Sequence, residues 1–137
     1  MDKKLKVLLA GPMPPPTIGG ISALIATLLS SRLPELVLLD TFDIGEPTES
    51  YVPGRISPRR LATMIRQLLG FSRRVRLMQP DVVHIHAPAS SGLAKASLFL
   101  LVSRSRGIPT VIHLHIWPEG LRLFGSKSTE RLMVALN

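Results

Sequence analysis

The sequence predicts an α/β fold, a Rossmann-like parallel sheet with helices on both faces. Short apolar runs of strand length alternate with longer segments of helical spacing, the order expected of successive βαβ units. The first run, residues 6–10 (KVLLA), is apolar after its lysine, which is typical of a parallel strand buried on both faces. Right-handed crossovers would place successive helices on the two faces of the sheet.

The first half of the chain continues this alternation. A helix is expected over residues 21–32, where small and branched apolar residues recur at helical spacing. A second strand is expected over residues 36–39, ending at Asp40. Residues 41–57 contain glycine and proline at four positions and are expected to form a loop.

The second half repeats the pattern. A long helix is expected to open at Ser57 or Pro58 and to reach about Met78, because Pro80 ends it. In such folds ligands bind beyond the carboxyl ends of the strands, near the topological switch point. The remaining expected elements are a strand over residues 81–86 (DVVHIH), a helix over 91–103, a strand over 110–115 (TVIHLH) and the start of a helix over 128–136.

The segment between the first strand and the first helix, residues 11–22 (GPMPPPTIGGIS), contains four prolines and three glycines. Gly19 and Gly20 lack Cβ atoms and precede a helix, so a ligand could approach the backbone and an anion would meet free amides. The alternative is a rigid connection without a ligand. The dinucleotide fingerprint GxGxxG is absent, which disfavours a nucleotide-dependent oxidoreductase, although Asp40 would be placed to contact a ribose.

The last two expected strands each end in a His-x-His pair, whose members share one face of a strand. The inner members, His84 and His113, are expected to be buried, hydrogen-bonded residues under helices. The outer members, His86 and His115, are expected to reach the carboxyl edge of the sheet. Two such pairs could bind a metal, but no cysteine or carboxylate accompanies them, so no metal site is expected.

Composition limits the class of protein. The 137 residues suffice for one domain with a core, and 45% apolar with 19% charged residues indicates a globular chain. The absence of cysteine excludes disulfides and thiolate chemistry. The apolar runs are too short for a secretory signal or a membrane span, so a cytoplasmic protein is expected, either free or peripheral at the inner face of the membrane.

The net charge of +8 comes from 17 lysines and arginines against 9 acidic residues. Seven arginines lie between Arg55 and Arg76, most of them in the long expected helix. One interpretation is a solvated basic face; the other is docking onto anionic lipid headgroups. Nucleic-acid binding is disfavoured, because none of the six aromatic residues lies in an RNA-binding motif. The helical wheel places Leu61, Met64, Ile65, Leu68 and Val75 on a core-facing arc and Arg59, Arg66, Arg73 and Arg74 on the face available to a membrane.

The ordered segments KVLLAGPMPPPTIGGIS, PDVVHIHAP and GIPTVIHLHIWPEG resemble the N-terminal domain of glycosyltransferase family 4, which has the GT-B fold. The resemblance covers most of the chain. It implies that residues 1–137 are the acceptor-side domain, incomplete at its C-terminal end. The second domain, which carries most nucleotide contacts and a paired-glutamate motif in that family, has no counterpart here.

The resemblance implies transfer of a sugar from a nucleotide-sugar donor, with retention of configuration and without a metal or other cofactor, to a glycan or lipid-linked acceptor. It places Gly19 and Gly20 near the donor phosphates and the acceptor, His115 close to the transferred sugar, and His86 on the acceptor side. Such a reaction needs positioned dipoles and cations more than a strong nucleophile. Without its donor half the isolated chain is expected to be nearly inactive. The alternative is a non-catalytic binding or recruiting subunit of a split, membrane-associated glycosyltransferase.

Overall fold

The computed structural model describes residues 3–15, 17–45, 57–88 and 91–115. The helix expected over residues 128–136 therefore lies outside the described residues. The elements are, in chain order, β1 (Lys6–Gly11), α1 (Gly20–Ser30), α2 (Leu33–Leu36), β2 (Leu38–Asp43), α3 (Pro58–Met78), β3 (Val82–Pro88), α4 (Ser91–Arg104) and β4 (Thr110–His115).

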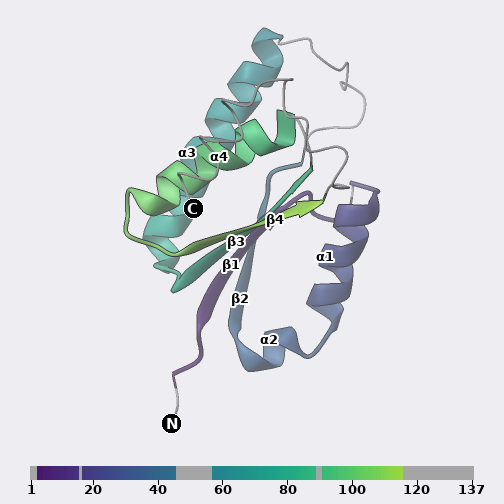
Figure 1. The fold of residues 1–137 in the computed structure, drawn as a ribbon, viewed down its shortest axis with the longest axis vertical. Helices are drawn as coiled ribbons and strands as arrows, with labels where there is room; N and C mark the ends of the chain where they lie inside the picture. Colours follow the sequence, from purple (N-terminus) through teal and green to yellow (C-terminus); the bar gives the residue numbers. More distant parts are fainter. Residues whose placement is uncertain (1–2, 16, 46–56, 89–90, 116–137) are drawn as a thin grey trace.

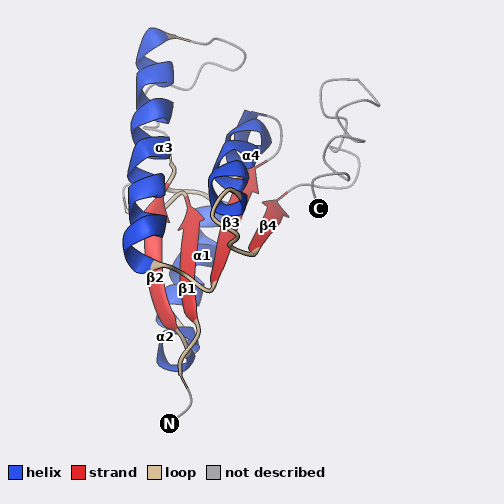
Figure 2. Cartoon of the chain, turned by 90° about the vertical axis from the view of Figure 1, so that its left-hand side faces the viewer, coloured by secondary structure: helices blue, strands red, loops and turns tan. Residues whose placement is uncertain are grey.

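The four strands form one parallel sheet in the order β2-β1-β3-β4. Helices α3 and α4 lie on one face of this sheet and α1 lies on the other (Figures 1 and 2). The predicted Rossmann-like fold class is thus confirmed. Because the chain passes from β1 to β2 on one side and then to β3 on the other, the topological switch point lies between β1 and β3.

The face under α3 and α4 holds the apolar core. Phe71 of α3 and Phe99 of α4 are fully buried, and their rings meet edge to face with centroids 4.9 Å apart. Phe42 of β2 contacts both rings in the same manner. Full burial of each large apolar side chain contributes roughly 1.5–3 kcal/mol. The strands supply the other side of this core through Leu8, Ala10, Val83, Ile85 and Ala87.

The opposite face is covered only in part. Ile25 of α1 is fully buried over β1, at the position of Gly11. A Cβ atom on Gly11 would lie 2.4 Å from Ile25 Cδ1 and 3.2 Å from His86 Cβ, so this glycine lets both side chains approach β1. On β4, by contrast, Val111 remains 53% exposed. Helix α1 therefore shields β1 and the neighbouring part of β3, and leaves β4 accessible.

The long helix α3 begins and ends as the sequence predicts. The Ser57 hydroxyl accepts a hydrogen bond from the Arg60 backbone N–H at 3.3 Å, and Pro58 occupies the first turn, where its missing N–H costs nothing. At the other end Gln79 adopts a left-handed conformation with φ of 49°, and its N–H bonds to the Val75 carbonyl. Local capping chemistry is sufficient to set both boundaries.

The second strand differs from its prediction. Residues 33–36 form the short helix α2, and β2 runs over Leu38–Asp43, paired with β1 along its whole length. Hydrogen bonding to β1 extends the strand into residues expected to form a loop. Asp40 consequently lies in the middle of β2, so its expected ribose contact at the strand end is wrong. Within the described part of the chain, no helix is both long and apolar enough to cross a membrane.

Candidate functional site at the carboxyl edge of the sheet

The loop after β1 is held by the last residue of β2. Asp43 Oδ1 accepts hydrogen bonds from the backbone N–H groups of Met13 at 3.1 Å and Gly45 at 2.8 Å. One carboxylate thus connects the loops that leave two adjacent strands. Sequence reasoning missed Asp43, because the strand was expected to end at Asp40. The signal for it was an aspartate two residues before a glycine in a loop.

Gly19 and Gly20 lie at the start of α1 in open space. Gly19 is the N-cap residue with φ of 165° and ψ of 173°, an extended conformation that any residue can adopt. A Cβ atom on either glycine would meet no atom within 4 Å, and among the described residues no side chain caps the first turn. Neither packing nor backbone conformation requires glycine here. The two glycines keep the approach to the first-turn amides open.

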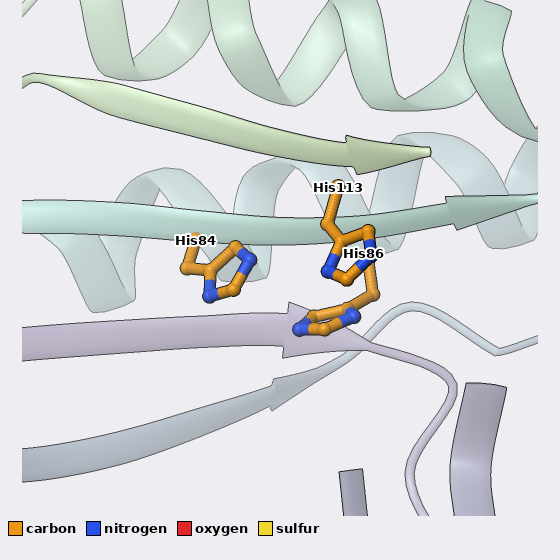
Figure 3. Close-up of side chains that lie close together, drawn as sticks. All are labelled: His84, His86 and His113. Carbon is orange, nitrogen blue, oxygen red and sulfur yellow. The ribbon is translucent and has the colours of Figure 1, made fainter. Parts of the chain in front are cut away.

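The four histidines gather on the α1 face of β3 and β4. His86 is paired in register with His113, and Pro88 with His115. The ring centroid of His86 lies 4.4 Å from the ring centroid of His84, 5.0 Å from that of His113 and 5.2 Å from that of His115. Figure 3 shows His84 and His86 on β3 and His113 on β4. The two His-x-His pairs, separated by 26 residues in the sequence, therefore form one cluster.

The burial of these histidines differs from the prediction. His86 is fully buried, His84 is half-buried and His113 is exposed. The expectation that His84 and His113 lie buried under helices is therefore wrong. The reason is the position of α1, which covers the part of β3 next to β1 and does not extend over β4. His115 is half-buried and is the last residue of β4.

One hydrogen bond links the two strands through this cluster. His86 Nδ1 and His115 Nε2 lie 2.9 Å apart, so one ring donates and the other accepts. The second nitrogen of His86, Nε2, is buried and has no hydrogen-bond partner among the described residues. Leaving a buried polar atom unpaired costs about 1–3 kcal/mol, which a ligand at this nitrogen could recover.

The pKa values of His84, His86 and His115 are lowered, which favours their neutral forms. Burial, together with repulsion from the neighbouring His84, His113 and His115, lowers the pKa of His86 to about 4. Burial, followed by the repulsion of nearby histidines, also lowers the pKa of His84 and of His115. At neutral pH these imidazoles therefore act as dipoles that donate and accept hydrogen bonds, and they do not supply positive charge.

A sequence model described as Glycosyltransferase Family 4 matches residues 23–136. The chain belongs to glycosyltransferase family 4. No curated protein and no solved structure gives a significant match. The family match contains all four histidines and begins just after Gly19 and Gly20. Family membership supports glycosyl transfer as the activity, with a sugar donor and an acceptor as substrates.

In this glycosyltransferase domain the exposed face of α3 is both basic and apolar. Arg59, Arg66, Arg73 and Arg74 are all exposed, and Arg74 also forms an ion pair with Asp40 through two of its nitrogens. This pairing raises the pKa of Arg74, chiefly through its hydrogen bonds to Asp40. Of the four arginines predicted to face a membrane, Arg74 is thus directed toward the sheet.

The apolar side of α3 also differs from the prediction. Leu61 is 46% exposed and Ile65 is 48% exposed, so their expected burial against the sheet is wrong. The fully buried residues of α3, Phe71 and Val75, lie in its second half. Its first half extends past the carboxyl edge of the sheet (Figure 2), which removes the surface that these side chains would cover.

Proposed function

We propose that the chain is the acceptor-side domain of a retaining glycosyltransferase, which moves a sugar from a nucleotide-sugar to a glycan or lipid-linked acceptor. The family match is the main support for the proposal. At the carboxyl edge of the sheet, the backbone amides at the start of α1 are open to a ligand, and His86 is hydrogen-bonded to His115. Open α/β sheets bind ligands at this edge, beside the switch point. Retention and the nucleotide-sugar donor are supported by the resemblance of the motifs to the family.

The proposed roles follow from exposure. The backbone N–H groups at Gly19 and Gly20 would donate hydrogen bonds to a phosphate or to a sugar hydroxyl oxygen, because open space lies above them. His115, half-buried at the end of β4, would hydrogen-bond the transferred sugar. His86 is fully buried, so we revise its role from substrate contact to positioning of His115. A neutral imidazole held in place by a second one is a preorganised dipole for a developing charge.

The proposal includes a second domain that holds the nucleotide. Family members place most nucleotide contacts there, so residues 1–137 alone would bind nucleotide-sugars weakly and turn over slowly. The competing function is a non-catalytic subunit that recruits a catalytic partner. Both functions require a partner domain or subunit. They differ in whether residues of this chain contact the reacting sugar, as in the acceptor-side domain, or do not, as in the recruiting subunit.

The experiment is a transfer assay on the chain joined to, or mixed with, its nucleotide-binding domain. Uridine- and guanosine-diphosphate sugars are supplied with a lipid-linked acceptor extract, and the anomeric configuration of the product is read by NMR. We expect release of nucleoside diphosphate and the same configuration in product as in donor. An inverted product contradicts the retaining mechanism. Transfer that is insensitive to substitution at His115 supports the recruiting subunit.

We further propose that the exposed face of α3 docks onto anionic lipid at the cytoplasmic face of the membrane. The supporting observation is that Leu69, 68% exposed, lies on the same outer face as Arg66 and Arg73. Arginines near an anionic surface contribute roughly 1 kcal/mol each, and apolar side chains between them add shallow insertion. Such docking would bring the sheet edge to a lipid-linked acceptor.

A further inference from the structure

The geometry points to a function for the histidine cluster that is separate from sugar transfer. We propose that His84, His86 and His113 bind one divalent transition-metal ion, with His115 as the residue that positions His86. One ring nitrogen from each of the three lies within 4.8 Å of the others. Figure 3 shows the three side chains, contributed by two adjacent strands.

The unpaired nitrogen of His86 is the main observation that supports a metal ion at this cluster. His86 Nε2 is buried and has no partner among the described residues, although buried polar atoms are nearly always paired. A metal ion at this nitrogen would use its lone pair. The same ion would be within reach of His84, two residues away on β3, and of His113, directly opposite on β4.

The contact between His86 and His115 fits a ligand that is oriented by a neighbour. If His86 binds metal through Nε2, its proton lies on Nδ1, which then donates to His115 Nε2 at 2.9 Å. Metal-binding histidines usually donate their second N–H to an acceptor that fixes the tautomer and the ring orientation. His115 is in place to perform this role in the cluster.

The cluster is open enough for an ion to enter and close enough to hold it. His113 is exposed at the edge strand, which provides a path from solvent. The three nitrogens lie within 4.8 Å of one another. Two nitrogens bound to one tetrahedral ion lie about 3.3 Å apart, so rotations of the rings would have to shorten each separation by at most about 1.5 Å. Three protein ligands leave one coordination position for water.

The donor set selects the type of ion. Imidazole nitrogens favour zinc, copper and nickel, whereas magnesium and calcium require oxygen ligands. The histidine motifs contain no cysteine or carboxylate, so the sequence predicts no metal site. A set of three histidines is itself a sufficient ligand set for zinc, once the fold has brought the two strands together.

Calorimetry with zinc chloride and the untagged 137-residue chain tests the proposal. We expect one zinc per chain and no heat from magnesium chloride. Replacing His84 or His113 by alanine should lower zinc affinity more than tenfold, and His115→Ala should lower it about 10–100-fold. Val111→Ala, which changes an exposed neighbour paired with His84, is the matched control and should leave the affinity unchanged.

A second measurement separates loss of ligands from loss of fold. Circular dichroism should show each variant folded, and the ring ¹⁵N spectrum of the natural chain should shift at His86 Nε2 when zinc is added. Unchanged zinc affinity in the folded His84→Ala/His113→Ala double variant would overturn the proposal. So would a natural chain that binds no zinc. Neither result bears on sugar transfer, which the transfer assay decides.

Discussion

The two faces of the sheet differ in their side chains and in how far helices cover them, although the same strands form both. The face under α3 and α4 is closed, apolar and centred on Phe71 and Phe99. The face under α1 is open toward β4 and carries all four histidines. Alternate residues of β3 and β4 thus supply the apolar core on one side and the histidine cluster on the other. The comparison teaches that the histidines concentrate on the face of the sheet that the described helices cover only in part.

The largest expected effect is on the closed face. Phe71→Ala removes a fully buried ring that contacts Phe42 and Phe99, and should lower the free energy of unfolding by about 3–5 kcal/mol. Val111→Ala on the open face should change it by less than about 0.5 kcal/mol. Urea denaturation of both variants measures the difference. Equal losses would show that the open face is packed as tightly as the closed one.

The next effect is on catalysis at the open face. Under the proposed function, with the nucleotide-binding domain present, His115→Ala should lower kcat on the order of 100-fold, because it would remove one positioned dipole near a developing charge. The control is again Val111→Ala, at equal folded fraction, with kcat near that of the natural chain. Steady-state kinetics provide the measurement. A silent His115→Ala variant would remove this residue from the reaction.

A smaller effect is expected on stability as a function of pH. The folded pKa of His86 is about 4, below the value near 6.5 of the unfolded chain, so the unfolded state binds more protons between these values. The contribution of neutral His86 to the free energy of unfolding is therefore complete above pH 6.5 and is lost as the pH falls toward 4. Urea denaturation from pH 7 to pH 5 without added metal should show a loss of about 1–2 kcal/mol.

The matched variant for this prediction is His86→Gln, which removes the titrating ring. Its loss of stability over the same pH range should be smaller, with the remainder due to His84 and His115, whose pKa values are also lowered. An equal slope in the variant would assign the pH dependence to other groups.

The smallest effect concerns the outer face of α3. Replacing Arg59, Arg66 and Arg73 by glutamine should abolish sedimentation with phosphatidylglycerol vesicles at low salt, at roughly 1 kcal/mol per arginine. Arg74→Gln is the matched control and should have little effect, since this side chain is engaged by Asp40. Leu69→Ser should weaken the binding that persists at physiological salt. Equal binding of the natural chain to neutral vesicles would contradict docking through charge.

The sequence alone determined the elements whose signals are local. The strand over residues 110–115 has the predicted bounds, and α3 has its predicted cap at Ser57 and its end before Pro80. The alternation of strands and helices predicted the parallel sheet. These features depend on periodicity, capping and chain stiffness, which act within a few residues.

Tertiary structure decided what lies between distant segments. Pairing with β1 extended β2 to Asp43, and the ion pair with Arg74 removed Asp40 from the candidate site. The register of β3 and β4 placed His86 beside His113, and the limited reach of α1 buried one ring and exposed the other. Each His-x-His motif fixes which side chains share a face of its own strand. The contacts between rings on different strands depend on the order and register of the strands in the sheet. Long-range strand pairing sets both, and a local sequence pattern does not predict them.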